Sequence, residues 1–368
     1  MNEPATPSKL IDDCFRQDPR DAARYSHAQA IAALRAAVAP TVATESVPIG
    51  LAAGRICAEP IAASRPVPGH TNAAVDGYAF AAADYDASRG TTFAVSGRAA
   101  AGQPIDGSVG RGQAVRIFTG AVVPADLDTV VMQEDCDVSG GTVQVPGGLK
   151  AGANVRCAGE DVGVGEALVA PGQRLRSQDI AALASSGRSS IACFRPVRVG
   201  IASTGDEIVP PAPGHDLADG QVFDVNSPML QTLVRQTGGE VVDLGLWPDQ
   251  RDTVRDRLED AAARCDVILT SGGASQGEED HIAHVLADMG HRHFWQIAIK
   301  PGRPLMLGQV GETVAVGLPG NPVAVFVCFL LYVRPLIGRL GGADWFEPRR
   351  FPLPAAFEVA NRKLGRRE

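Results

Sequence analysis

Residues 313–322 read TVAVGLPGNP, a run rich in apolar and β-branched residues that passes into a turn containing glycine and proline. Residues 265–273 (CDVILTSGG) repeat this pattern, and a stretch with helical periodicity follows each of them. Short apolar runs bounded by turn residues predict buried strands, and strands that alternate with helices predict a parallel α/β sheet. Ligands of such sheets bind at the carboxyl ends of the strands, where both loops are expected.

The same alternation extends over residues 196–341. Residues 197–203 (VRVGIAS) predict a strand that enters the loop Thr204-Gly205-Asp206-Glu207. Asn226 suits the N-cap of the next helix, with Pro228 in its first turn. Further predicted elements are a strand at 240–246 and helices at 252–264, 280–289 and 323–340, besides a helix nearer the N-terminus at 21–39 and another at 178–186.

Composition narrows the class of protein. The chain has 34 basic and 42 acidic residues, a net charge of −8, which argues against a general nucleic-acid binder. Its 41 glycines and 26 prolines exceed the usual share and imply many tight turns. Residues 50–150 alternate short apolar runs with such turns, so we expect a small, mostly β domain there.

Several features favour a cytoplasmic protein without a membrane span. The longest apolar run, residues 323–333, is shorter than the roughly 18 residues that cross a bilayer, and it predicts a buried helix. The first residues are polar, and no apolar segment of a signal peptide follows them. The seven cysteines show no C-x-x-C pair, which is typical of free thiols in a reducing compartment.

Two glycine loops suit a phosphate or a pterin edge. In LPGNP, Gly320 can take a positive φ, and Asn321 and Pro322 suit a helix start whose N–H groups attract anions. In SGGAS, residues 271–275, two glycines and two hydroxyls allow the backbone to wrap around a ligand. A plain capped turn and a flexible βα loop remain the alternatives.

Charged loop residues indicate a metal and an oxyanion. Carboxylates of this kind hold Mg²⁺ together with substrate phosphates, although solvated acidic loops look the same in sequence. Lys300 and Arg303 lie on a loop stiffened by proline and could bind an oxyanion, or form a solvated turn. The histidines at 281, 284, 291 and 293 lack a zinc pattern, and we expect surface histidines. The acidic loop residues are Glu160, Asp161, Asp206, Glu207, Asp249, Glu278, Glu279 and Asp280.

Eight short strings, in one order along the chain, together resemble the molybdopterin molybdenumtransferase family, which includes MoeA and the gephyrin E domain. The strings are 72–79 (NAAVDGYA), 116–121 (RIFTGA), 128–134 (DTVVMQE), 159–161 (GED), 203–207 (STGDE), 271–273 (SGG), 298–302 (AIKPG) and 318–322 (LPGNP). One such string alone would be weak evidence for the family. Eight strings in the same order are specific to it, and the resemblance covers most of residues 20–360.

The resemblance implies a chain of α/β and β domains. The α/β domain that binds molybdopterin, with a parallel sheet, would span 196–341, and the small mostly-β domain 51–149. Residues 1–50 with 150–195 would form an elongated linker domain. Residues 342–368 would begin a C-terminal β domain that is incomplete here, with a first strand at 351–359. The family also implies a homodimer whose cleft lies between the α/β domain of one subunit and the small β domain of the other.

The implied reaction is insertion of molybdate into adenylylated molybdopterin, with Mg²⁺ as cofactor and release of AMP. A molybdopterin adenylyltransferase is the implied partner. Two alternatives stay open: a scaffold that binds molybdopterin without full activity, and a nucleotide-processing hydrolase on the same α/β domain.

The family's site residues carry over position by position. Thr119, Glu160, Asp249, Asp280 and Lys300 are the implied catalytic residues. Asp128, Glu160, Asp249 and Asp280 are the implied Mg²⁺ ligands. The implied pterin- and phosphate-binding residues are Asp206, Ser271, Gly272, Gly273, Ser275, Lys300, Arg303, Pro319, Gly320, Asn321 and Pro322.

Some positions depart from the family pattern. Thr71 stands where the family usually has aspartate, and Gln296 where it has lysine. Arg303 replaces a common lysine and keeps its charge but not its shape. Asp126-Leu127 replaces Gly-Ala. Loss of one acid and one base from a charged site favours the scaffold alternative.

Overall fold

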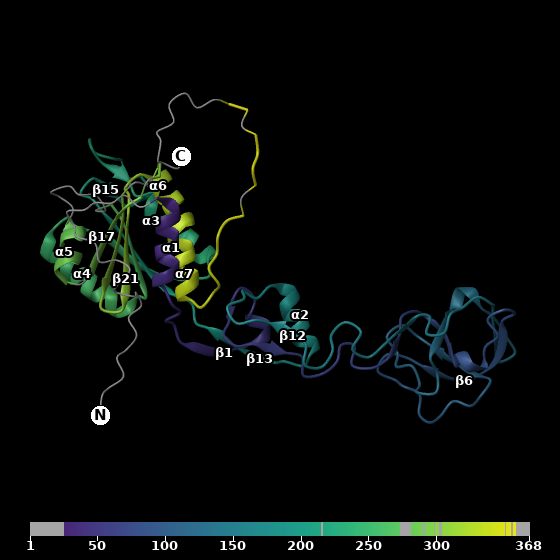
Figure 1. The fold of residues 1–368 in the computed structure, drawn as a ribbon. Helices are drawn as coiled ribbons and strands as arrows, with labels where there is room; N and C mark the ends of the chain where they lie inside the picture. The colour runs from purple at the N-terminus through teal and green to yellow at the C-terminus, as the bar shows by residue number, and fades with distance from the viewer. Residues whose placement is uncertain are drawn as a thin grey trace, which may run out of the picture. The chain divides into compact units, whose positions relative to one another are not determined.

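A computed structural model describes residues 26–214, 216–272, 281–289, 291–297, 299–301, 304–349, 351–354 and 356–357. The chain divides into two compact units (Figure 1). The α/β unit comprises Met1–Glu59, Ala170–Ser177 and Ser190–Glu368, and the β unit comprises Pro60–Val169 and Gln178–Ser189. The chain therefore passes between the units four times.

The α/β unit is built on a six-stranded sheet with the order β17-β14-β18-β21-β20-β19. Its strands are β14 (Arg198–Thr204), β17 (Glu240–Trp247), β18 (Val267–Ser271), β19 (His291–Gln296), β20 (Pro304–Val310) and β21 (Thr313–Leu318). The first four strands in the sheet order are parallel, but β20 runs antiparallel to both of its neighbours, β21 and β19. The prediction of a wholly parallel sheet is therefore wrong at this edge. Only Gly311 and Glu312 separate β20 from β21, and so short a loop allows only an antiparallel hairpin.

Helices cover both faces of this sheet. One face carries α1 (His27–Ala37), α3 (Asn226–Gln236), α6 (Pro322–Cys328), η5 (Phe329–Val333) and α7 (Arg334–Leu340). The other carries α4 (Arg251–Arg264) and α5 (His281–Met289). Alternate strand residues enter the two cores: Leu269 packs on the first face and Ile268 on the second. Val254, Leu258 and Ala261 of α4 are fully buried, as their spacing predicts.

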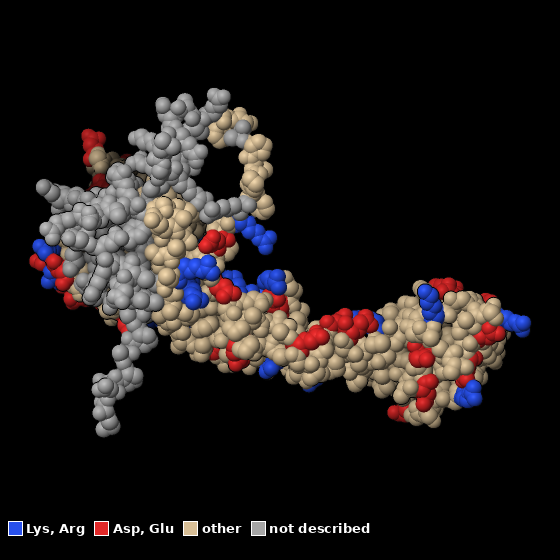
Figure 2. Space-filling model, viewed as in Figure 1, with Lys and Arg blue, Asp and Glu red and all other residues tan. Residues whose placement is uncertain are grey.

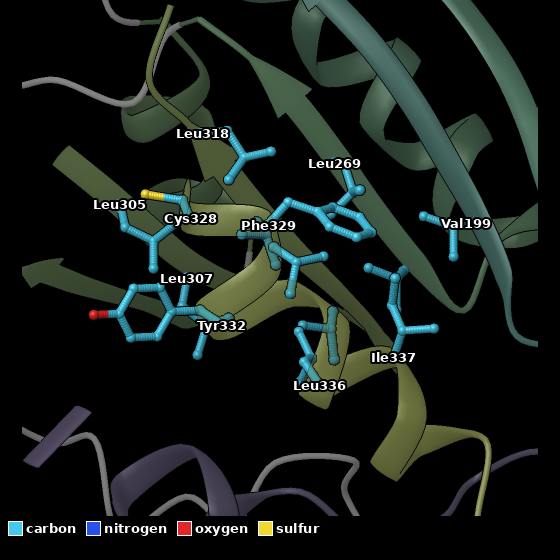
Figure 3. Close-up of a cluster of buried hydrophobic side chains, with 14 of the residues drawn as sticks. Val199, Leu269, Leu305, Leu307, Leu318, Cys328, Phe329, Tyr332, Leu336 and Ile337 are labelled. Carbon is cyan, nitrogen blue, oxygen red and sulfur yellow. The ribbon is translucent and has the colours of Figure 1, made fainter. Parts of the chain in front are cut away.

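The predicted helix 323–340 is present as α6, η5 and α7 in succession. Phe329, Tyr332, Leu336 and Ile337 belong to this core, in which Phe329 lies beside Leu269 and Tyr332 beside Leu307 (Figure 3). Among the described residues, Pro322–Leu340 is long and apolar enough to cross a membrane, but 56% of its most apolar window is buried inside the protein. It therefore packs as the core helix that the sequence predicts.

The N-terminal helix and a small sheet complete the α/β unit. Ser26 and Gln29 form a capping box at the start of α1. Leu34 of the same helix is buried. The predicted helix 21–39 is confirmed for α1, while residues 21–25 lie outside the described part. The small sheet has the order β1-β13-β2, with β1 (Thr44–Pro48), β2 (Ile56–Cys57) and β13 (Ser190–Phe194).

The β unit contains a six-stranded sheet with the order β8-β5-β7-β6-β10-β9. These strands are β5 (Gly77–Phe80), β6 (Thr91–Ala99), β7 (Gln113–Ile117), β8 (Thr129–Met132), β9 (Asp137–Ser139) and β10 (Thr142–Val145). Two short pairs join β3 (Ile61–Ala62) to β12 (Ala167–Val169), and β4 (Asn72–Ala73) to β11 (Val155–Arg156). Helix α2 (Ser177–Ser185) ends near Gly187, whose φ is +84°. The strands expected within residues 50–150 are thus present.

Charges and thiols follow ordinary patterns. Figure 2 shows acidic and basic side chains interspersed on the visible face of each unit. Exposed pairs such as Arg264–Asp260 stabilise the fold only slightly. The six cysteines in the described residues are free, as predicted, and burial raises the pKa of the Cys328 thiol to about 12.

The C-terminal residues differ from the prediction. Residues 351–354 and 356–357 form no strand, although the sequence predicts one at 351–359. A strand needs a hydrogen-bonded neighbour, and no described strand pairs with these residues. Phe351, Leu353 and Phe357 are exposed there.

Asp76-Gly77-Tyr78 is part of one string of the resemblance, and packing against β8 explains the glycine at position 77. A Cβ on Gly77 would lie 1.7 Å from the carbonyl oxygen of Val131 on β8. We expect Gly77→Ala to lower the free energy of unfolding of the β unit by about 3 kcal/mol, because backbone must move to relieve the overlap. Amide hydrogen exchange in the β unit measures this.

A matched control is Gly69→Ala in the same unit, where the nearest atom would be 4.0 Å from the new Cβ. It should leave the exchange rates within a small factor of the original. Equal protection in the two variants would contradict the steric explanation.

Candidate functional site: a pocket at the carboxyl ends of the parallel strands

The loops after β14, β18 and β21 border one pocket of about 490 Å³. The sequence predicts that TGDE, SGG and PGNP meet at this edge, and the structure confirms it with Thr204 and Glu207, Ser271 and Gly272, and Gly320 and Pro322. The remaining lining residues are Ser203, Ile208, Val222, Phe223, Asp224, Val225 and Asn226. Most of these come from the segment between β14 and α3, of which the sequence analysis assigned only Asp206 to the site.

Asp224 caps helix α3. Its Oδ1 accepts hydrogen bonds from the backbone N–H groups of Asn226 and Ser227, each at 3.0 Å. Its Oδ2 accepts from the Ser203 hydroxyl at 2.6 Å. The prediction that Asn226 is the N-cap is therefore wrong: Asn226 is the first residue of the helix, because an acid two residues earlier already takes the free N–H groups.

The side chain of Asn226 does not cap the helix, and it connects two loops of the pocket instead. Its Nδ2 donates to the Ser271 hydroxyl at 2.7 Å and to the Gly320 carbonyl oxygen at 2.8 Å. Its side chain is buried, with 7% of the residue exposed. The amide thus fixes the loop after β18 against the loop after β21.

The glycines of the two loops have different roles. Gly272 has a φ of +95°, and a Cβ there would lie 2.6 Å from the Thr204 carbonyl oxygen, so this close approach requires glycine. Gly320 does not have the positive φ that the sequence reading allowed. A Cβ on Gly320 would meet nothing within 4 Å, so its backbone is open to the pocket.

Asn321 acts as the predicted N-cap of α6. Its Oδ1 accepts from the N–H groups of Val323 at 3.0 Å and Ala324 at 3.2 Å, and Pro322 occupies the first turn. These two N–H groups are therefore already paired. This favours the capped-turn alternative over the expected anion site at that helix end.

The other predicted residues of the α/β unit are placed as follows. Asp206 and Lys300 are exposed, Asp249 is half-buried just before α4, and Pro319 is buried. Gly273, Ser275, Asp280 and Arg303, together with Glu278 and Glu279, lie outside the described residues.

The predicted residues of the β unit all have partners. Thr119 donates its N–H and its hydroxyl to Asp76 Oδ1, at 2.8 and 2.7 Å. Asp128 Oδ1 accepts from the Ala82 N–H at 2.8 Å, and Glu160 pairs with Arg156 at 3.3 Å. Within the described ranges, no three or more His, Cys, Asp or Glu side chains gather closely enough to hold a metal ion. The predicted Mg²⁺ ligand set stays a prediction.

Two residues that depart from the family pattern, Thr71 and Asp126, accept hydrogen bonds from backbone N–H groups. The Thr71 hydroxyl accepts from the Ala158 N–H at 3.3 Å, close in sequence to Glu160. Asp126 Oδ2 accepts from the Val109 N–H at 3.0 Å. Gln296 ends β19, and its side chain lies outside the described part of the chain.

Thr119 lowers the pKa of Asp76 through two hydrogen bonds, first that of its backbone N–H and then that of its hydroxyl. We expect Thr119→Val to raise this pKa, because the hydroxyl bond is lost, while the backbone bond keeps it below its ordinary value. NMR titration of the Asp76 carboxyl measures the shift. Asp86, whose carboxylate bonds to Ser88, is the internal reference and should titrate unchanged.

Comparison with known proteins shows the class of protein to which this chain belongs. Residues 25–187 match the MoeA N-terminal region (domain I and II), and residues 200–339 match the probable molybdopterin binding domain. The chain thus joins a MoeA-type N-terminal region to a molybdopterin-binding α/β domain.

Individual relatives define the family. A molybdopterin molybdenumtransferase of Haemophilus influenzae is 38% identical over 318 residues, covering 86% of this chain and 78% of the relative. One of a Nostoc species is 36% identical, covering 83% and 71%. The crystal structure of the MoeA molybdopterin biosynthesis protein of Pyrococcus horikoshii has a TM-score of 0.75 at 30% identity, covering 88% and 80%. The chain belongs to the molybdopterin molybdenumtransferase family, and it is a transferase of molybdenum cofactor biosynthesis.

Proposed function

We propose that this chain inserts molybdate into adenylylated molybdopterin, with Mg²⁺ as cofactor and release of AMP. The observation that carries the proposal is the pocket at the carboxyl ends of β14, β18 and β21. It is lined by three loops of the resemblance, in a chain 38% identical to a transferase of this name. We further propose a cytoplasmic homodimer that receives its substrate from a molybdopterin adenylyltransferase.

Each charged residue has a proposed task. Asp128, Glu160, Asp249 and Asp280 would hold Mg²⁺, since carboxylate oxygens are the ligands this ion prefers. Bound Mg²⁺ would supply charge neutralisation on the phosphate oxygens. Lys300 and Arg303 would neutralise phosphate or molybdate, and Thr119 would act as a hydrogen-bonding residue of the catalytic site. Ser271, Gly272, Gly273, Ser275 and Asp206 would contact the pterin substrate with Pro319, Gly320, Asn321 and Pro322.

The test is release of AMP from adenylylated molybdopterin by the purified chain with Mg²⁺. We expect release to need molybdate and to fall to background with a chelator of Mg²⁺. Binding of molybdopterin without any release of AMP would refute the transferase proposal and support the scaffold.

The scaffold alternative rests on a specific observation, the glutamine at 296 where the family has lysine. If a missing cation limits the reaction, Gln296→Lys should increase the rate of AMP release. An unchanged rate in that variant would mean that the departure does not weaken catalysis.

A further inference from the structure

Two buried cysteines lie opposite each other in the small sheet of the α/β unit. In the antiparallel pair of β13 and β2, Cys193 is the partner of Cys57. Directly opposite residues of an antiparallel pair have their side chains on the same face of the sheet. Both cysteines are fully buried, and both are free thiols. The sheet therefore brings together two thiols from distant parts of the chain.

The hydrogen bonds around Cys57 identify the type of pair. Its N–H donates to the Gln173 carbonyl oxygen at 3.0 Å, so this N–H is not directed at Cys193. Ala58, the next residue, donates to the Ala192 carbonyl oxygen at 3.0 Å. Cys57 and Cys193 are therefore a non-hydrogen-bonded pair, the type in which opposite Cα atoms are closest, about 4.5 Å apart. A disulfide needs a Cα separation of about 4.4–6.8 Å, which this type of pair provides.

The surroundings of the two thiols slow their reactions. Burial raises the pKa of the Cys193 thiol to about 11, while the Arg55 guanidinium opposes this rise and the Cys57 thiol adds to it. The two sulfur groups are thus close enough to act on each other. Burial likewise raises the pKa of Cys57, whose Sγ donates to the Glu59 carbonyl oxygen at 3.2 Å. Because the thiolate is the reactive form, oxidation depends on local opening of the sheet.

The other described cysteines are internal references for this pair. Cys265 and Cys328 are buried in the cores on opposite faces of the six-stranded sheet, so the sheet separates them. Cys136 and Cys157 belong to the β unit, where Cys157 is exposed. In the described strand pairs, no other cysteine lies opposite a cysteine.

The position of the pair along the chain determines what a bond between the thiols would enclose. Cys57 precedes the first passage of the chain into the β unit, and Cys193 follows its last return. Both segments of the β unit, Pro60–Val169 and Gln178–Ser189, lie between the two cysteines. A disulfide would therefore enclose the whole β unit in one covalent loop that begins and ends in the α/β unit. Closing a loop reduces the entropy of the unfolded chain, and more so for a long loop.

We propose that Cys57 and Cys193 are a site of reversible oxidation by a hydroperoxide, at which they form a disulfide that encloses the β unit. One thiolate attacks an oxygen of hydrogen peroxide, the O–O bond breaks and hydroxide leaves, which gives a sulfenic acid. The second thiolate attacks that sulfur, and hydroxide leaves as the S–S bond forms. The two thiols together lose two electrons, and peroxide is reduced to two molecules of water that take up the two thiol protons.

A dithiol reductant reverses the reaction by thiol–disulfide exchange. Disulfides are rare in a reducing compartment, and those that form there are usually transient and serve catalysis or the sensing of oxidants. The inference goes beyond the proposed function, because neither cysteine belongs to the pocket or to the residues proposed for catalysis.

The experiment treats the full chain with hydrogen peroxide, blocks the remaining free thiols with N-ethylmaleimide, and digests the protein with trypsin without a reductant. Trypsin cleaves between the two cysteines, so mass spectrometry detects the disulfide as two joined peptides. We expect the link between Cys57 and Cys193 to be the main intramolecular disulfide and to disappear with dithiothreitol. The oxidised chain should melt about 5 °C or more above the reduced chain, because the loop is closed.

Substitutions of single cysteines test the assignment. Cys57→Ser and Cys193→Ser should each abolish both the link and the shift in melting temperature, and the melt of the reduced variant shows that it is folded. Cys57→Ala adds no polar group to the buried position and replaces the serine variant if serine prevents folding. Cys265→Ser is the matched control, because it changes a buried cysteine with no cysteine opposite it, and it should keep the link and the shift.

Modification of the exposed Cys157 shows that peroxide has reacted with the protein. Four results would overturn the inference: no link between Cys57 and Cys193 at peroxide concentrations that modify Cys157, a main intramolecular link through another cysteine, a link that forms only after denaturation in urea, or an oxidised chain that melts no higher than the reduced chain.

Discussion

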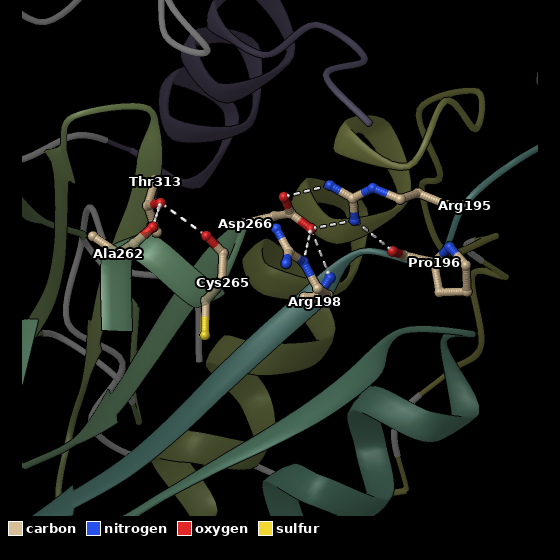
Figure 4. Close-up of polar contacts among 7 residues, drawn as sticks. All are labelled: Arg195, Pro196, Arg198, Ala262, Cys265, Asp266 and Thr313. Carbon is tan, nitrogen blue, oxygen red and sulfur yellow. Dashed lines mark hydrogen bonds and ion pairs between the residues drawn. The ribbon is translucent and has the colours of Figure 1, made fainter. Parts of the chain in front are cut away.

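Replacing Asp266 by alanine is expected to lower the free energy of unfolding of the α/β unit by about 4 kcal/mol. Asp266 lies at the amino ends of β14 and β18, and only 2% of it is exposed. Its two oxygens accept from both terminal nitrogens of Arg195 at 2.7 and 2.8 Å, and one also accepts from the Arg198 N–H at 2.8 Å (Figure 4). The hydrogen bond to Asp266 raises the pKa of the Arg195 guanidinium. Removing the carboxylate leaves this guanidinium without its counterion.

Denaturant unfolding followed by tryptophan fluorescence measures this change. Trp247, Trp295 and Trp345 all belong to the α/β unit, so the signal reports that unit. The matched control is Asp260→Ala, which removes an exposed acid that pairs with Arg264 on α4 and should cost about 0.5 kcal/mol or less. Similar losses in the two variants would show that burial of the Asp266 pair contributes little.

Local sequence patterns predicted the α/β framework well. Helix α4 follows directly from the spacing of Val254, Leu258 and Ala261, and the positions of three pocket loops follow from strands that end in glycine turns. The antiparallel edge was missed because the sequence analysis assigned no strand to Pro304–Val310. Direction is determined by the two-residue loop at Gly311 and Glu312, and that spacing was the available signal.

The role of Asn226 was less accessible to sequence reasoning. Both aspartate and asparagine cap helices, and only the folded backbone shows that Asp224 takes the free N–H groups of α3. The contacts of Asn226 then join residues 45 and 94 positions away, to Ser271 and Gly320. Such contacts follow from the sheet order, which no local pattern contains.

Lys300→Ala is expected to reduce the rate of AMP release by about 100-fold or more under the proposed function. Lys300 is exposed in the loop that follows β19, in a chain whose net charge is −8. An anionic substrate approaching such a protein needs local positive charge where negative charge develops. Because the resemblance implies a lysine where this chain has Gln296, we expect Lys300 to contribute more of that positive charge.

Steady-state release of AMP at varied substrate concentration separates binding from catalysis. Neutralisation in the transition state predicts that kcat falls, whereas a role in substrate binding alone would raise KM and leave kcat unchanged. Lys300→Arg should recover part of kcat, because arginine keeps the charge but not the geometry of the ammonium group. Lys150→Ala, which removes an exposed lysine of the β unit, should retain the wild-type rate. If Lys300→Ala and Lys150→Ala behaved alike, the charge at position 300 would have no part in the reaction, and Arg303 would be the next cation to test.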